Sequence, residues 1–331
     1  MDPLSWLKLS PELQKQLQDM RYAILDLGTN TFNLLIIEAG TGNRGNIILS
    51  RKEPVKLGED GITRGMISER AFARGLAAIG NHMRYINDCR AGHIYAYATS
   101  AIRSAGNGLE FVRVVYEKFN IGIQVISGDK EAELIYRGVK QAVDMADTRH
   151  LILDIGGGSN ELIIADGNRI YWKKSFPMGM ARLLEQFRPS DPVTPQEIKE
   201  FEDYFGLHLD SFFEAAFIHR PDILIGSSGT FDTFRALLSE NYRGGEPSGS
   251  PFFTIDTDDF GKLHQRLLES TSAERLRMKG MDPVRVEMIV IAAIFVNFIV
   301  SRLNIRTMIQ SDYSLKEGAV SEILEQQMLS T

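Results

Sequence analysis

Two short segments of this chain end an apolar run in an aspartate and continue with glycine and hydroxyl residues. The first is Asp26-Leu27-Gly28-Thr29-Asn30 and the second is Asp154-Ile155-Gly156-Gly157-Gly158-Ser159. Glycine lets the backbone aim successive N–H groups at one anion, so two such turns that face each other would clamp a phosphate. A carboxylate beside a bound phosphate also suits a hydrated Mg²⁺ ion. We therefore expect phosphate to bind Gly28, Thr29, Asn30, Gly156, Gly157, Gly158 and Ser159, and metal to bind Asp154 and Asp26.

A third glycine turn, Gly226–Thr230, follows a short apolar segment and precedes a helical pattern. The N-terminus of a helix adds free N–H groups and a favourable dipole for an anion. Ser228, Gly229 and Thr230 are therefore further phosphate-binding candidates. One such turn alone indicates no more than a hairpin, and the two aspartates could serve only as turn caps. Three such turns in one chain are hard to explain by structure alone.

The chain carries an internal repeat, because the pattern of Ile24–Ile37 recurs at Ile152–Ile164. Each copy predicts a β-hairpin closed by a tight glycine turn. Strand and helix patterns then alternate in each half, which predicts an α/β fold with mixed sheets covered by helices. We expect a helical extension at 1–20, a first domain at 21–147 joined by a C-terminal helix at 314–331, and a second domain at 148–313.

Composition limits the classes of function. The net charge of -6 disfavours a sequence-independent grip on nucleic acid. Residues 1–20 lack the apolar core of a signal peptide, and the apolar stretch Met288–Val300 is too short to span a bilayer and predicts a buried helix. The single cysteine, Cys89, indicates a reducing compartment. We expect a cytoplasmic protein that binds neither nucleic acid nor membrane.

Together these segments resemble the exopolyphosphatase/guanosine pentaphosphate phosphatase family of the actin-like ATPase superfamily. Three more motifs carry the resemblance, at Thr99–Asn107, Ser127–Ala132 and Ser311–Gly318. The family resemblance implies a duplicated actin-like (ribonuclease H-like) fold of two lobes, each with a mixed five-stranded sheet flanked by helices. It further implies a phosphohydrolase, dependent on Mg²⁺ or alternatively Mn²⁺, that releases terminal orthophosphate from polyphosphate or guanosine pentaphosphate in the interdomain cleft. A homodimer is expected by the same resemblance.

The resemblance also assigns roles to three charged residues. Glu131 matches the family's catalytic base, and a carboxylate within hydrogen-bond reach can orient and deprotonate an attacking water. Arg103 matches the family's arginine near the catalytic centre, where a guanidinium neutralises phosphoryl oxygens. Glu161 resembles a family residue in the metal or water shell. The plainer alternatives are a solvated helix residue, a surface ion pair and an edge-strand charge, respectively.

This chain departs from the family pattern at three positions. Lys130 stands where the family usually has a second glutamate, Asn160 where it generally has threonine, and Lys316 where it generally has arginine. The charge reversal at Lys130 either alters the preferred substrate charge or has no role. A non-hydrolytic polyphosphate or nucleotide sensor and an actin-like ATPase or kinase are the alternative functions. Longer members of the family continue well beyond the position of Gly318, so processive degradation of long chains is left open.

Overall fold

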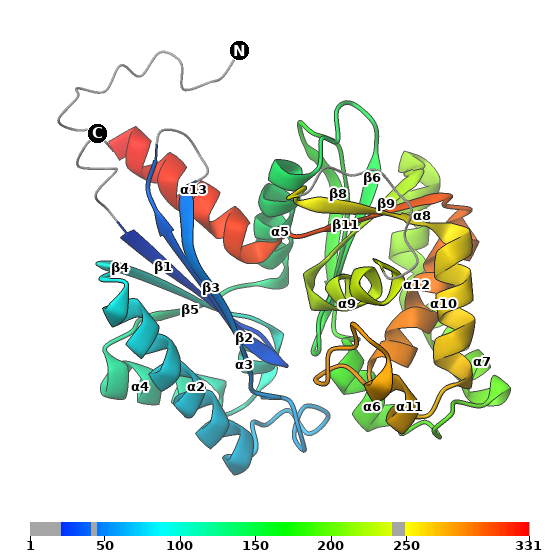
Figure 1. The fold of residues 1–331 in the computed structure, drawn as a ribbon, viewed down its shortest axis with the longest axis horizontal. Helices are drawn as coiled ribbons and strands as arrows, with labels where there is room; N and C mark the ends of the chain where they lie inside the picture. Colours follow the sequence, from blue (N-terminus) through cyan, green and yellow to red (C-terminus); the bar gives the residue numbers. More distant parts are fainter. Residues whose placement is uncertain (1–20, 41–44, 240–248, 331) are drawn as a thin grey trace.

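The computed structural model describes residues 21–40, 45–239 and 249–330, and the helical extension predicted at 1–20 lies outside them. The described strands form two mixed sheets, one in each lobe (Figure 1). The first sheet has the order β3-β2-β1-β4-β5, and the second has the order β10-β11-β9-β6-β7-β8. In both sheets an antiparallel meander continues into parallel strands, as the internal repeat predicts.

The first sheet is covered on both faces. Successive side chains of a strand point to opposite faces, so Tyr22 and Ile24 enter one core while Ala23 and Leu25 enter the other. The strands are β1 (Arg21–Leu27), β2 (Thr31–Glu38), β3 (Asn46–Pro54), β4 (His93–Ala98) and β5 (Ile123–Val125). The helices of this part of the chain are α2 (Glu69–Asp88), α3 (Ser100–Ser104), α4 (Gly108–Phe119) and α5 (Gly128–Ala142).

The second sheet repeats the first and adds a strand. Its strands are β6 (His150–Ile155), β7 (Asn160–Ala165), β8 (Ile170–Phe176), β9 (Ile223–Ser227), β10 (Phe252–Asp256) and β11 (Thr307–Ser311). The duplicated α/β fold is thus as predicted, but this sheet has six described strands where five were expected. The additional strand is β10, which pairs antiparallel with β11 at the edge of the sheet. Its five residues are too few to show a strand periodicity in the sequence.

Helices surround the second sheet. They are α6 (Met180–Phe187), α7 (Pro195–His208), α8 (Asp210–His219), α9 (Ser228–Leu238), α10 (Thr257–Glu269), α11 (Ser272–Arg277) and α12 (Ile289–Leu303). The apolar stretch that predicts a buried helix forms α12, which is apolar on nearly all sides because it lies in the centre of this lobe's core. No helix among the described residues is long and apolar enough to cross a membrane.

The last helix, α13 (Leu315–Ser330), begins beside α5 where the two lobes meet and runs across the first lobe (Figure 1). Residues of both helices and of both sheets share one apolar core. Two glycines allow the close crossing: a Cβ at Gly318 would lie 1.8 Å from Leu134 O, and one at Gly138 would lie 1.9 Å from Ser314 O. Beyond this crossing α13 packs on β1. The shared core fixes the N-terminus of α5 against the gap between the lobes.

Candidate active site

The N-terminus of α5 places Glu131 at the junction of the lobes. Ser127 caps the helix, because its Oγ accepts a hydrogen bond from Lys130 N at 3.2 Å. Glu131 then lies buried in the first turn, where Arg103 Nη1 donates to its Oε2 at 2.7 Å. Burial raises the pKa of Glu131 well above its usual value, the charge of Glu161 raises it further, and Arg103 opposes both. A carboxylate with a raised pKa is a stronger proton acceptor.

The two Asp-Gly turns have the same geometry. Gly28 N donates to Thr31 O, and Gly156 N donates to Ser159 O, both at 3.1 Å. A Cβ would lie only 2.9 Å from the acceptor oxygen at Gly28 and 2.6 Å from it at Gly156. Both turns therefore need glycine for the same steric reason, which explains why the repeat is visible in the sequence.

These turns touch each other across the junction of the lobes. A Cβ at Gly157 would lie 2.6 Å from Asn30 Nδ2, and a Cβ at Gly158 would lie 2.7 Å from Thr29 Oγ1. The start of α6 holds the second turn in place, since Met180 N donates a hydrogen bond to the carbonyl oxygen of Gly156 at 2.9 Å. The turns thus form one continuous wall.

The third turn lies at the N-terminus of α9 and fixes Asp154. Ser227 Oγ and Ser228 Oγ both donate to Asp154 Oδ2, at 2.7 Å and 2.6 Å. Ser228 has a φ of 68°, a left-handed conformation that is uncommon for a residue with a Cβ. Such strain is concentrated at functional sites. The first N–H groups of α9, from Ser228 to Thr230, are available to an anion at the helix terminus.

Seven of the described carboxylates line the same cavity, which has a volume of about 430 Å³, and burial raises the pKa of four of them, Asp26, Glu131, Asp154 and Glu161. Burial raises the pKa of Asp26 to about 6, although Asn33 Nδ2 donates to it at 2.8 Å. Burial and the charge of Asp154 raise the pKa of Glu161 to about 7, and hydroxyl donors oppose the shift. The pKa of Asp154 is also raised by burial. With Glu131, the cluster concentrates negative charge that a cation would stabilise.

The chemistry of Asp26, Asp154 and Glu161 fits Mg²⁺. All three offer hard oxygen donors, and each has a pKa raised by burial. The described residues contain no group of three or more His, Cys, Asp or Glu side chains that together could hold a metal ion. Mg²⁺ commonly binds through one or two carboxylates together with water and substrate phosphates. The donor set therefore suits an ion that binds together with a phosphate substrate.

The structure gathers nearly all of the predicted site residues around this cavity. The lining includes Asp26, Gly28, Thr29, Asn30, Glu131, Asp154, Gly156, Gly157, Gly158, Ser159, Glu161, Ser228, Gly229 and Thr230. Among the described residues that line it, Arg103 is absent, and its guanidinium instead contacts Glu131 and the carbonyl oxygen of Ile126. In this structure Arg103 therefore holds the predicted base.

The similarity to known proteins agrees with this geometry. A model of the Ppx/GppA phosphatase family matches residues 35–327. This chain belongs to that family. Its sequence is 26% identical over 307 residues to "Exopolyphosphatase 1" of Mycobacterium leprae, covering 92% of this chain and 90% of that protein.

Solved structures of similar proteins show the same architecture. The crystal structure of an exopolyphosphatase from Cytophaga hutchinsonii superposes with a TM-score of 0.89 at 36% identity, covering 93% of this chain and 98% of that one. The Aquifex aeolicus family member superposes with a TM-score of 0.75 at 26% identity, covering 93% and 98% of the two chains. The predicted family and fold class are both confirmed.

The three departures from the Ppx/GppA pattern lie in different environments. Lys130 is outside the described lining of the cavity and forms an ion pair with Glu322 of α13. Asn160 is buried, and its Nδ2 donates to Met178 O at 2.9 Å. Lys316 lines the cavity; burial lowers its pKa, but nearby carboxylates, led by Glu317, raise it above the usual value. Lys316 thus stays positively charged inside the cavity.

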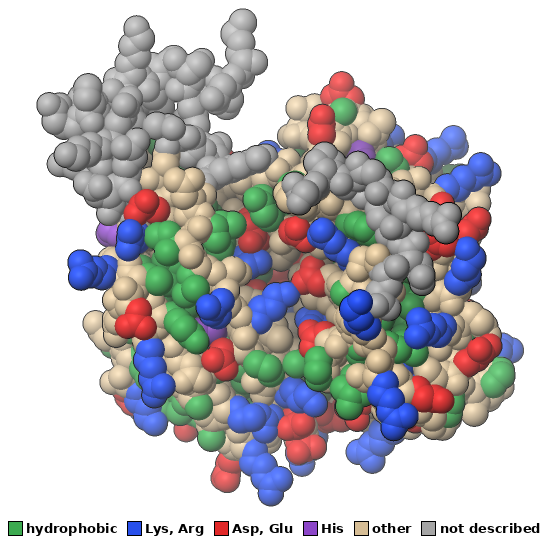
Figure 2. Space-filling view, in the orientation of Figure 1, with side chains coloured by type: hydrophobic (Ala, Val, Ile, Leu, Met, Phe, Trp, Pro, Cys, Tyr) green, Lys and Arg blue, Asp and Glu red, His purple; other side chains and the backbone are tan. Residues whose placement is uncertain are grey.

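Several cavity residues carry no recognisable signal in the sequence. They come from β3, α9 and the segment before α12, and they are Lys52, Asp232, Arg235 and Arg285. Asp312 also lines the cavity; it lies in the motif Ser311–Gly318, but the sequence assigns it no role. On the face drawn in Figure 2, Lys and Arg side chains lie among Asp and Glu side chains where the two lobes meet. Only the fold brings these scattered charges to one cavity.

Proposed function

We propose that this protein is a phosphohydrolase that releases terminal orthophosphate from inorganic polyphosphate in the cavity between its lobes. The names of its relatives support this substrate. The position of Glu131 carries the proposal: a buried carboxylate with a raised pKa lies in the same cavity as three glycine turns. Guanosine pentaphosphate, whose terminal group is also a phosphoanhydride, is the second substrate to test.

The residues of the cavity have distinct tasks in this reaction. The N–H groups of the three turns bind the oxygens of the terminal phosphoryl group and orient it. Glu131 orients a water molecule and takes a proton from it as the water oxygen attacks phosphorus. The bond to the bridging oxygen breaks, and the shortened polyphosphate leaves. Arg103 fixes the carboxylate of Glu131 and limits the rise of its pKa.

One or two of the carboxylates Asp154, Asp26 and Glu161 would hold Mg²⁺, or alternatively Mn²⁺, together with water and the substrate phosphates. When bound, the ion supplies positive charge that offsets the charge of the phosphoryl oxygens. Ser227 and Ser228 hold the Asp154 carboxylate in place through their hydroxyl groups. Lys316, in the first turn of α13, adds a positive charge to the cavity.

Orthophosphate release tests the function directly. Short polyphosphate, long polyphosphate, guanosine pentaphosphate and ATP are compared at equal phosphate concentration, with Mg²⁺, with Mn²⁺ and with a chelator. Release from polyphosphate well above release from ATP is expected, and it should require the metal. Release only from ATP would favour the ATPase alternative, and binding without release would favour the sensor. The sensor alternative was suggested by the unusual Lys130, but this side chain forms an ion pair with Glu322 of α13, outside the described cavity lining.

Glu131→Gln tests the assignment of the base. Loss of a general base lowers turnover by about 100-fold or more, whereas binding of polyphosphate should persist. Glu133→Gln is the matched control, since Glu133 lies on the same helix but pairs with Lys173 outside the described cavity lining. Unchanged turnover in Glu131→Gln would contradict the assignment.

Localisation in the cytoplasm and a homodimer stay predictions.

A further inference from the structure

One ion pair of the cavity differs from the others because it joins the two lobes. The described basic residues that line the cavity each pair with a carboxylate: Lys52 with Asp232, Arg235 with Asp312, Arg285 with Asp282, and Lys316 with Glu317. Of the last three pairs, Arg285 with Asp282 and Lys316 with Glu317 are local in sequence, and Arg235 with Asp312 joins α9 to the segment after β11. Lys52 extends from β3 of the first sheet, and Asp232 belongs to α9 of the second lobe. Their Nζ and Oδ2 atoms are 2.7 Å apart.

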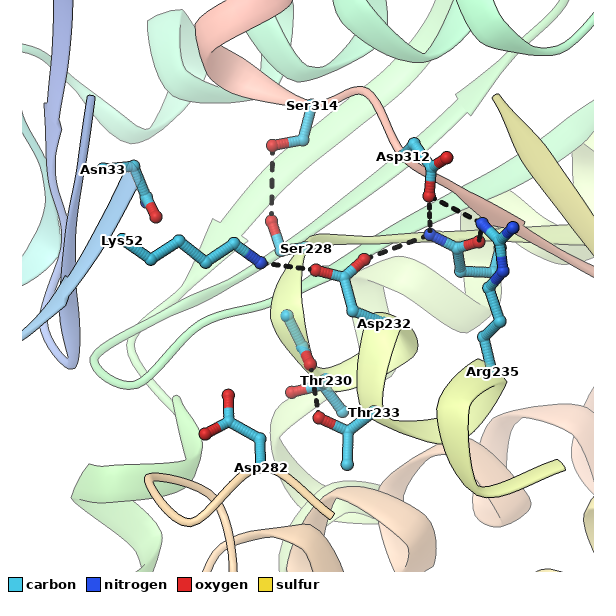
Figure 3. Close-up of polar contacts among 12 residues, drawn as sticks. Asn33, Lys52, Ser228, Thr230, Asp232, Thr233, Arg235, Asp282, Asp312 and Ser314 are labelled. Carbon is cyan, nitrogen blue, oxygen red and sulfur yellow. Dashed lines mark hydrogen bonds and ion pairs between the residues drawn. The ribbon is translucent and has the colours of Figure 1, made fainter. Parts of the chain in front are cut away.

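Asp232 has a second hydrogen-bond partner in its own lobe, whereas the Lys52 ammonium has no other partner among the described residues. Figure 3 shows Lys52 reaching across to Asp232 from the first sheet. On the opposite side, Gln310 Nε2 donates to Asp232 Oδ1 at 3.1 Å and to Asp312 Oδ1 at 3.0 Å. Arg235 Nη1 completes this network by donating to Asp312 and to Gln310 Oε1. The flexible partner is therefore Lys52, whose long side chain remains half-exposed on an edge strand.

An incoming polyphosphate would compete with Asp232 for this ammonium group. Exposed ion pairs contribute little to stability, so the exchange of one anion for another is easy. A phosphate group offers several charged acceptor oxygens, and Lys52 lines the same cavity as the glycine turns. Asp232, left without its partner, keeps the hydrogen bond from Gln310. The Asp232 carboxylate thus occupies the Lys52 ammonium group until a phosphate replaces it, and its own charge repels a polyanion.

We propose that Lys52 is a substrate-binding residue that Asp232 holds in reserve, and that a phosphate behind the terminal one displaces Asp232 from it. This inference rests on the proposed phosphohydrolase function and names a specificity determinant for it. The exchange also breaks an ion pair between the lobes at the cavity. Substrates with several linked phosphates therefore gain a contact that orthophosphate alone does not reach.

The proposal predicts opposite effects for the two partners. Lys52→Gln removes the reserved ligand, so binding should weaken about threefold to tenfold at low salt. Asp232→Asn frees Lys52 and removes a repulsive charge, so binding should strengthen about threefold. In the double variant, the Asp232 substitution should have little effect, because the ligand that it releases is gone. Lys52→Arg keeps the charge and should retain most of the affinity.

Calorimetric titration with a methylene-bridged tripolyphosphate measures binding without hydrolysis. The full chain and its variants are compared at low and high salt, with Lys262→Gln as control, because Lys262 pairs with Asp259 on α10 with a similar spacing of 2.8 Å. Opposite shifts in the two single variants, absent from the control and reduced at high salt, support the proposal. Equal binding by wild type, Lys52→Gln and Asp232→Asn overturns it. An Asp232→Asn gain of the same size in the Lys52→Gln background also overturns it, since Asp232 would then act by repulsion alone.

The same titration separates this inference from the function on which it rests. A wild-type protein that neither binds the analogue nor releases orthophosphate from polyphosphate contradicts the proposed function itself. A wild-type protein that does both, with unchanged affinity in both single variants, contradicts only the role of Lys52 and Asp232.

Discussion

Replacing Glu161 with glutamine should make the metal-free protein more stable at alkaline pH. Glu161 is fully buried beside Asp154, and its burial together with the charge of Asp154 raises its pKa to about 7. Glutamine keeps the shape of the side chain and can still accept the hydrogen bonds from Ser159 Oγ and Ser175 Oγ, which are 2.8 Å and 2.6 Å long. The substitution removes the buried charge and leaves the surrounding contacts in place.

The direction of the pH dependence follows from proton binding. The folded protein binds the Glu161 proton more tightly than the unfolded chain, whose glutamate pKa is near 4.5. The favourable contribution of this proton is fully present below pH 4.5 and is lost as pH rises to about 7. The difference between the two pKa values corresponds to about 3 kcal/mol. Weaker hydrogen bonds to a neutral amide offset about 1 kcal/mol, so the net gain at pH 8 is about 2 kcal/mol.

Thermal and urea unfolding of metal-free protein at pH 5 and pH 8 measures this difference. A gain of about 2 kcal/mol corresponds to a rise in Tm of about 4–8 °C for a domain of 150–250 residues. The difference in stability between Glu161→Gln and wild type should disappear at pH 5. It should also decrease when Mg²⁺ is added, because the ion offsets the Glu161 charge, which only the wild type has. Glu133→Gln is the control and should give no gain, since Lys173 lowers the pKa of Glu133. A Glu161→Gln protein that is less stable than wild type at pH 8 would refute the reasoning.

Two further substitutions test the elements that position the site. Gly318→Ala should destabilise the fold by about 1–3 kcal/mol and lower activity, because the new Cβ would lie 1.8 Å from Leu134 O at the crossing of α5 and α13; urea unfolding and phosphate release measure both effects. Arg103→Gln should move the acidic limb of the pH–rate profile to higher pH, because Arg103 lowers the pKa of Glu131. Arg113→Gln, which removes an exposed ion pair on α4, is the control and should leave the profile unchanged. A Gly318→Ala protein of normal stability, or an unshifted profile in Arg103→Gln, would contradict these assignments.

The parts of the site that the sequence predicts are those where local geometry demands particular residue types. Gly28 and Gly156 are required by their turns, so the repeat and the shared wall were visible in the sequence. Lys52 lies within β3 and Asp232 within α9, outside the glycine turns whose geometry selects particular residue types. Their proximity depends on how the two sheets face each other. For the same reason the sequence indicates that Lys130 is unusual but does not show that its partner is Glu322.

The two lobes are joined by two kinds of contact, and the proposed base and the phosphate-binding turns belong to different ones. Glu131 begins α5, whose buried residues belong to the core shared by both sheets and α13. The contacts across the cavity are of a different kind, because the glycine turns meet side to side and Lys52 forms a half-exposed ion pair with Asp232. Separating the lobes at the cavity would therefore expose little apolar surface and would cost far less than disrupting the shared core. We therefore expect the base to keep its position on α5 while the lobes separate at the cavity to admit and release a polyanion.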